Sequence, residues 1–139
     1  WDAAESRGEL TEFTRGAISL RKKFSQLRRT AYYDDSKEGN DSPGIRWFSP
    51  DGKNPEWSHD RAVAILLDPM PSQTGALLIL CNAGAYNADF SLPAPPGTPW
   101  EIALNSAAGS PVGDIATGNK WVGERSILVL MSETTPADE

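Results

Sequence analysis

The chain has 139 residues, of which 39% are hydrophobic and 23% are charged, as expected of one globular domain. Its net charge of −6 argues against a nucleic-acid partner, because phosphate groups require a basic surface. The longest apolar runs, such as Ala76 to Cys81, are too short to cross a bilayer, so no membrane partner is expected.

One amphipathic helix is predicted near the N-terminus, from Glu9 to Arg29. Two capping-box spacings mark alternative starts, Asp2 with Glu5 and Ser6 with Glu9. One face is polar, and the other carries an apolar stripe that must pack on something, because an isolated helix of this length is marginal in water. We expect the stripe either to fold back on the rest of the chain or to pair with a second copy. Ile18 lies outside it. The stripe consists of Leu10, Phe13, Ala17, Leu20, Phe24 and Leu27.

The chain after Pro43 predicts only short strands and turns. Arg61–Leu67 and Ala76–Cys81 are nearly all apolar, which is typical of central strands covered on both faces. The fold class is therefore mainly β: an antiparallel Greek-key sandwich of about seven or eight strands, preceded by one amphipathic α-helix. The predicted strands are residues 45–49, 61–67, 76–81, 88–92, 100–104, 112–115, 121–122 and 126–131.

Composition divides the chain into four parts. Residues 1–30 hold the helix, and residues 31–44 are a polar, Gly- and Pro-bearing linker loop. Residues 45–132 form the sandwich, and residues 133–139 are expected to be a disordered tail.

Nothing in the sequence predicts a catalytic residue, a cofactor or a metal site. The sole histidine, His59, has only neighbouring loop carboxylates beside it, and metal sites usually need several His or Cys ligands. The single cysteine, Cys81, lies in an apolar run, which favours a core thiol in a reducing, cytoplasmic setting. A stand-alone enzyme based on His59 and acidic loops is the weakest alternative.

The five tryptophans divide by context. Trp47 and Trp100 alternate with apolar neighbours, which predicts core positions. Trp57 and Trp121 lie in more polar stretches and could be exposed, where an indole can stack on a sugar ring.

The order of several motifs resembles the C-terminal region of isoamylase-type bacterial glycogen debranching enzymes, in the α-amylase clan of glycoside hydrolases. Ser25 or Gln26 stands where that family commonly has proline, and Asn105-Ser106 where it often has Asp-Thr. The matching segments are Trp1-Asp2, Leu20–Arg29, Ile45–Trp47 with Asp51-Gly52, Trp57, Leu77–Asn82, Phe90–Pro93 with Trp100, and Arg125–Leu130.

The resemblance implies a catalytic (β/α)8 barrel upstream of Trp1, where all catalytic carboxylates of the family lie. This chain would then be the last barrel helix and the C-terminal sandwich, and the helix stripe would face the barrel. Its partner would be the barrel of the same parent chain, which cleaves α-1,6 branches during glycogen breakdown. The chain alone would be no enzyme and would meet α-glucan only through that parent. The alternative is an independent carbohydrate-binding module that uses Trp57 or Trp121.

Overall fold

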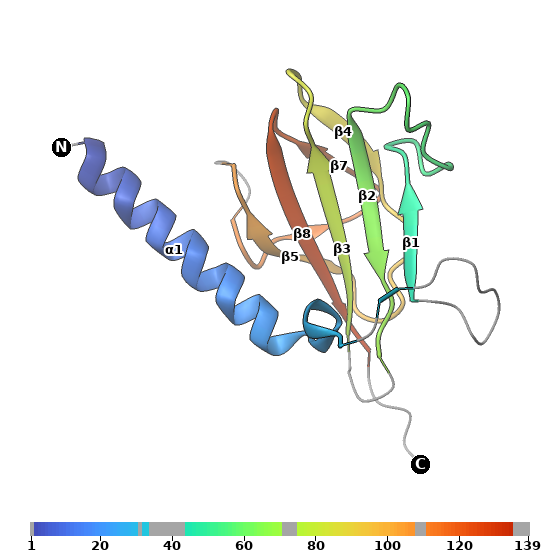
Figure 1. Cartoon of the computed structure of the whole chain (residues 1–139), viewed down its shortest axis with the longest axis horizontal. Helices are drawn as coiled ribbons and strands as arrows, with labels where there is room; N and C mark the ends of the chain where they lie inside the picture. The colour runs from blue at the N-terminus through green and yellow to red at the C-terminus, as the bar shows by residue number, and fades with distance from the viewer. Residues whose placement is uncertain (1, 31, 34–43, 71–74, 108–110, 135–139) are drawn as a thin grey trace, which may run out of the picture.

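The computed structural model describes residues 2–30, 32–33, 44–70, 75–107 and 111–134. Within these ranges the chain forms helix α1 (Asp2–Lys23), a short 3-10 turn, η1 (Ser25–Arg28), and eight strands in two antiparallel sheets (Figure 1). The mainly β class, a sandwich preceded by one helix, is thereby confirmed. Most of the predicted linker, and residues 135–139 of the predicted tail, fall outside the described residues.

The larger sheet has the strand order β1-β2-β3-β8-β5-β6, and β4 pairs with β7 in the smaller one. The chain leaves the large sheet after β3 and after β6 and returns with β5 and β8, as expected of Greek-key connections. The strand predicted at 112–115 is only the two-residue β6, and β8 runs one residue past the expected boundary at 132. The bounds are β1 Ile45–Phe48, β2 Ala62–Leu67, β3 Gly75–Asn82, β4 Ala88–Ser91, β5 Trp100–Asn105, β6 Ile115–Ala116, β7 Asn119–Val122 and β8 Ser126–Glu133.

Both faces of the large sheet are covered, as the apolar runs of β2 and β3 predict. Because successive side chains of a strand point to opposite faces, each central strand contributes to two separate clusters. The cluster between the sheets contains Ala64, Leu66, Leu78, Leu80, Leu128 and Leu130, together with Phe90 and Val122 from the small sheet. The cluster beneath the helix contains Leu67, Leu77 and Val129, flanked by Ile65, Ile79 and Met131.

An irregularity in β5 brings this strand to the helix. The register between β5 and β8 shifts between Ile102 and Leu104, as in a β-bulge. Ile102 packs between the sheets, whereas Ala103 and Leu104 both belong to the cluster beneath the helix. Leu104 lies directly under Gly16, where an added Cβ would stand 3.1 Å from Leu104 Cδ1. Gly16 therefore permits the close approach of α1 to β5.

The helix ends earlier than predicted. α1 spans Asp2–Lys23, Phe24 is extended (φ −106°, ψ 109°), and η1 follows over Ser25–Arg28, so a continuous helix to Arg29 is wrong. The break turns the Phe24 ring into the cluster beneath the helix, where only 2% of the residue is exposed. The Arg28 guanidinium donates to the carbonyls of Arg21 (2.8 Å) and Lys22 (3.2 Å), which caps the free end of α1.

Only part of the predicted apolar stripe packs on the sheet. Phe13, Ala17, Leu20, Phe24 and Leu27 all belong to or flank the cluster beneath the helix, so the stripe folds back on this chain. Leu20 and Phe24 are buried there, so these two side chains are not available to another domain. Leu10 is 64% exposed and Ile18 is 51% exposed. The N-terminal half of α1 diverges from the sheet in Figure 1, and no described strand covers Leu10.

The two tryptophans predicted to be core residues differ in how deeply they are buried. Trp100 is 1% exposed, and its indole Nε1 donates to the Pro93 carbonyl at 2.8 Å, so this prediction is confirmed. Trp47 is only half-buried, because it lies on the edge strand β1 and meets the exposed Trp57 edge-on.

The two glycines inside α1 give a matched test of how the helix approaches the sheet. Gly8 has no neighbouring atom within 4 Å of an added Cβ, so Gly8→Ala should raise the free energy of unfolding by up to about 1 kcal/mol. Gly16→Ala should give little or no gain, because its methyl group meets Leu104. Urea unfolding followed by circular dichroism measures both. Equal stabilisation by the two variants would contradict the close contact.

Candidate functional site

Several titratable side chains of the described residues form surface ion pairs. No group of three or more His, Cys, Asp and Glu among the described residues could hold a metal ion. His59 is exposed, and its Nδ1 lies 2.8 Å from the Ser58 hydroxyl. Asp68 pairs with Arg46 at 3.0 Å, and Glu12 pairs with Arg15 at 2.8 Å. These pairs are exposed ion pairs of the ordinary surface kind.

Among the described residues, two groups have clearly shifted pKa values, Asp51 and Cys81. The Ser49 hydroxyl and the Lys53 amide donate to Asp51 and hold the pKa of this carboxyl below its usual value. A general acid needs the reverse. Burial raises the pKa of the half-buried Cys81 thiol, so it is less available as a thiolate nucleophile.

The described helices also do not combine the length and apolar character that a membrane span requires.

The two indoles predicted to be exposed are exposed, but on different elements. Trp57 is 67% exposed in the β1–β2 connection, and its ring meets Trp47 edge-on at 5.6 Å between centroids. Trp121 is 63% exposed on β7, opposite Asp89 of β4. Each indole is therefore accessible for stacking on a ligand. Neither indole lines any of the hollows described below.

The face of α1 turned away from the sheet is the first candidate interaction surface. We call Leu10, Thr11, Thr14, Arg15 and Ile18, which line a shallow hollow there, the outer helix face. The Thr11 hydroxyl donates to the Arg7 carbonyl at 2.7 Å and the Thr14 hydroxyl to the Leu10 carbonyl at 2.8 Å. Because both hydroxyls are bonded to the helix backbone, the face is more apolar than its sequence suggests.

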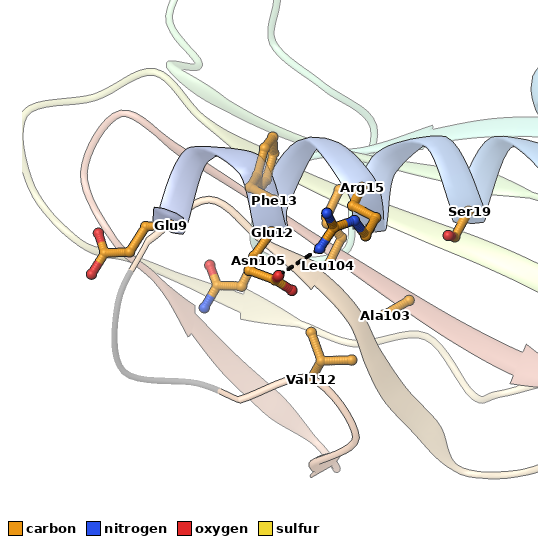
Figure 2. A pocket seen from close by; sticks show the side chains of 10 residues that line it. Glu9, Glu12, Phe13, Arg15, Ser19, Ala103, Leu104, Asn105 and Val112 are labelled. Carbon is orange, nitrogen blue, oxygen red and sulfur yellow. Dashed lines mark hydrogen bonds and ion pairs between the residues drawn. The ribbon is translucent and has the colours of Figure 1, made fainter. Parts of the chain in front are cut away.

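A groove of about 510 Å³ runs beside this face, between α1 and β5 (Figure 2). Phe13, Leu104 and Val112 give it an apolar lining, while Glu9 and Glu12 add carboxylates from the helix. Arg15 lines both the groove and the outer helix face, so the two hollows adjoin. An apolar patch rimmed by charged groups is typical of a protein-docking surface.

Sequence reasoning found only part of this surface. It singled out Leu10 and Ile18, but it assigned Leu10 to the same face as Phe13 and Leu20. The spacing i, i+4, i+8 of Leu10, Thr14 and Ile18 could have revealed a second row. Val112 could not be found in this way, because the β5–β6 region brings it to the groove from far along the chain.

The chain was compared with known proteins. No protein-family model and no curated protein matches the sequence. Among solved structures, the fold resembles part of a pullulanase from Anoxybacillus sp. LM18-11, crystallised with maltotetraose, with a TM-score of 0.61. The likeness covers 95% of this chain at 14% identity, and this chain spans only 16% of that pullulanase. At this identity the likeness establishes the fold alone.

Substitutions of two leucines can test which part of the predicted stripe packs on the sheet. Leu20→Ala should lower the free energy of unfolding by about 2–4 kcal/mol, because Leu20 is 9% exposed in the cluster beneath the helix. Leu10→Ala should change it by less than about 0.5 kcal/mol, because Leu10 is exposed. Urea titrations of the two variants measure the difference. Similar losses would mean that the first half of α1 is also packed.

Proposed function

We propose that this chain is the non-catalytic C-terminal β-sandwich of a glycoside hydrolase that degrades α-glucans, of the isoamylase-like glycogen debranching type that cleaves α-1,6 branches. The ordered motifs from Leu20–Arg29 to Arg125–Leu130 support this assignment. The fold likeness to a small part of a pullulanase agrees with an accessory role beside a larger domain. A cytoplasmic location belongs to the same proposal and is supported by the single Cys81 thiol.

The observation that best supports the proposal is the exposure of the outer helix face. The inner side of α1 is already packed on this chain, yet Leu10 and Ile18 remain 64% and 51% exposed beside a further apolar groove. We infer that the catalytic (β/α)8 barrel of the same parent covers this face. The sandwich would then brace the barrel, because the Phe24 and Leu20 contacts fix α1 to the sheet. A second copy of this chain, in a weak homodimer through the helix, is the rival occupant.

A second candidate function is an independent carbohydrate-binding module. The exposure of Trp57 and Trp121 favours it, since an indole that packs little within the chain is free to stack on a sugar. Loss of sugar binding on substitution of either indole would support this alternative over a purely bracing role.

The chain alone should release no reducing ends from a branched α-glucan. The pKa of the Asp51 carboxyl is lowered, whereas a glycosidic general acid requires a raised pKa. A reducing-sugar assay with glycogen measures this, and debranching activity of a longer protein that carries the barrel serves as the positive control. Clear release by the 139-residue chain would overturn the assignment.

The barrel contact can be tested in a protein that joins the upstream reading frame to this chain. Leu10→Glu and Ile18→Glu should lower the melting temperature of the barrel, because each would bury an unpaired charge at the contact. Ile115→Glu is the matched control, since Ile115 is 59% exposed but lies on the edge strand β6.

In the isolated 139-residue chain, all three variants should have the same melting temperature as the unsubstituted chain. Equal melting of the barrel in all three would contradict the contact. So would a dimer of the isolated chain, seen by light scattering, that Ile18→Glu abolishes.

A further inference from the structure

A second cleft, of about 530 Å³, opens at the end of the large sheet where β2 begins and β3 ends. One wall is the β1–β2 connection with His59, Asp60 and Arg61, and the other is the β3–β4 turn with Gly84 and Tyr86. Figure 1 places both loops at one end of the sheet. The η1 turn is attached at the other end of the sheet. There Gln26 Nε2 donates to the carbonyls of Asp68, just after β2, and Gly75, at the start of β3.

The walls of this cleft are held in place by a buried amide. Asn82 is 4% exposed, and its Nδ2 lies 2.9 Å from the Tyr86 carbonyl oxygen, 3.0 Å from that of Gly123 and 3.1 Å from that of Val122. The two amide hydrogens are therefore shared among three acceptors. Its Oδ1 accepts the amide hydrogen of Gly84 at 2.9 Å. The side chain thus joins the β3–β4 turn to the end of β7, and the cleft is formed before any ligand arrives.

Two backbone contacts add to this rigidity. The Ala83 amide donates to the Arg61 carbonyl at 2.9 Å, which ties one wall to the other. The Arg125 amide donates to the Gly84 carbonyl at 3.2 Å, and Arg125 has a φ of 47°, a left-handed conformation that is costly for a residue with a side chain. A preformed site loses less entropy when a ligand binds.

The side chains at the cleft match an uncharged, hydroxyl-rich ring. Tyr86 is 86% exposed, so its ring contributes little to the core and presents a flat face for stacking. Asp60 and Arg61 carry opposite charges side by side, which gives neither anions nor cations a clear preference. The Asp60 Oδ2 already accepts the Glu56 amide hydrogen at 2.8 Å, which leaves Oδ1 and the Arg61 fork to bond to hydroxyl groups.

We propose that this cleft binds a short α-1,4-linked glucan, with the Tyr86 ring stacked on one sugar and Arg61 and Asp60 bonded to its hydroxyl groups. The choice of an α-glucan rests on the proposed function, whereas the choice of a neutral sugar rests on the cleft itself. Tyr86 is a residue that sequence analysis did not single out. Because η1 and the cleft lie at opposite ends of β2 and β3, the helix attachment does not obstruct the site.

The test is calorimetric titration of the 139-residue chain with maltotetraose. We expect weak, saturable binding that Tyr86→Ala weakens about tenfold or more and Tyr86→Phe largely keeps, because the ring remains. Arg61→Ala should weaken binding by a smaller factor. Tyr32→Ala is the matched control, since it removes another highly exposed tyrosine ring that does not line the cleft, and it should bind as the unchanged chain does. Trp57→Ala and Trp121→Ala distinguish this cleft from the alternative carbohydrate-binding module. Unchanged melting temperatures of the exposed variants verify folding.

Several results would overturn the proposal. Absence of saturable binding of maltotetraose and of cellotetraose would remove the cleft as a sugar site and leave the bracing role untouched. Binding that Tyr86→Ala does not weaken, or that Trp57→Ala or Trp121→Ala abolishes, would place the sugar elsewhere. Binding of cellotetraose alone, lost in Tyr86→Ala, would overturn the α-glucan assignment and with it the substrate class of the proposed function.

Discussion

The alternation of side chains in β3 and β8 is the constraint on which the rest of the structure depends. Leu78 and Leu130 pair across the two strands and point toward the small sheet, whereas their neighbours Leu77 and Val129 point toward the helix. A sheet that is apolar on both faces must be covered on both. The small sheet covers one face and α1 with η1 covers part of the other, so the position of the helix follows from the sheet.

The strands could be predicted from the sequence because their apolar runs are bounded by turn residues. Arg61–Leu67 and Ala76–Cys81 became β2 and β3 with shifts of about one residue at an end, a usual uncertainty for element boundaries. The end of α1 could not be predicted in this way. Phe24 continues the helical stripe, but its ring packs against β3, where a Cβ on Gly75 would lie 2.8 Å from it.

The candidate sites were less predictable than the fold. The bulge that turns Leu104 toward Gly16 has no local sequence signal, and it shapes the groove beside α1. His59–Arg61 and Asn82–Tyr86 are distant in sequence, and only the antiparallel pairing of Ala62 with Asn82 brings them together. Exposure of Trp57 and Trp121 was predictable from their polar surroundings, yet the aromatic residue at the cleft is Tyr86.

The position of β8 also has a consequence for how the chain acquires its structure. β8 is the last of the described strands, yet it lies between β3 and β5 in the middle of the large sheet. During synthesis β3 therefore emerges long before β8, and the edge of β3 that pairs with β8 stays open until β8 leaves the ribosome. Pairing between such distant segments is slow, and exposed strand edges invite aggregation. The large sheet is therefore complete only after β8 has been synthesised.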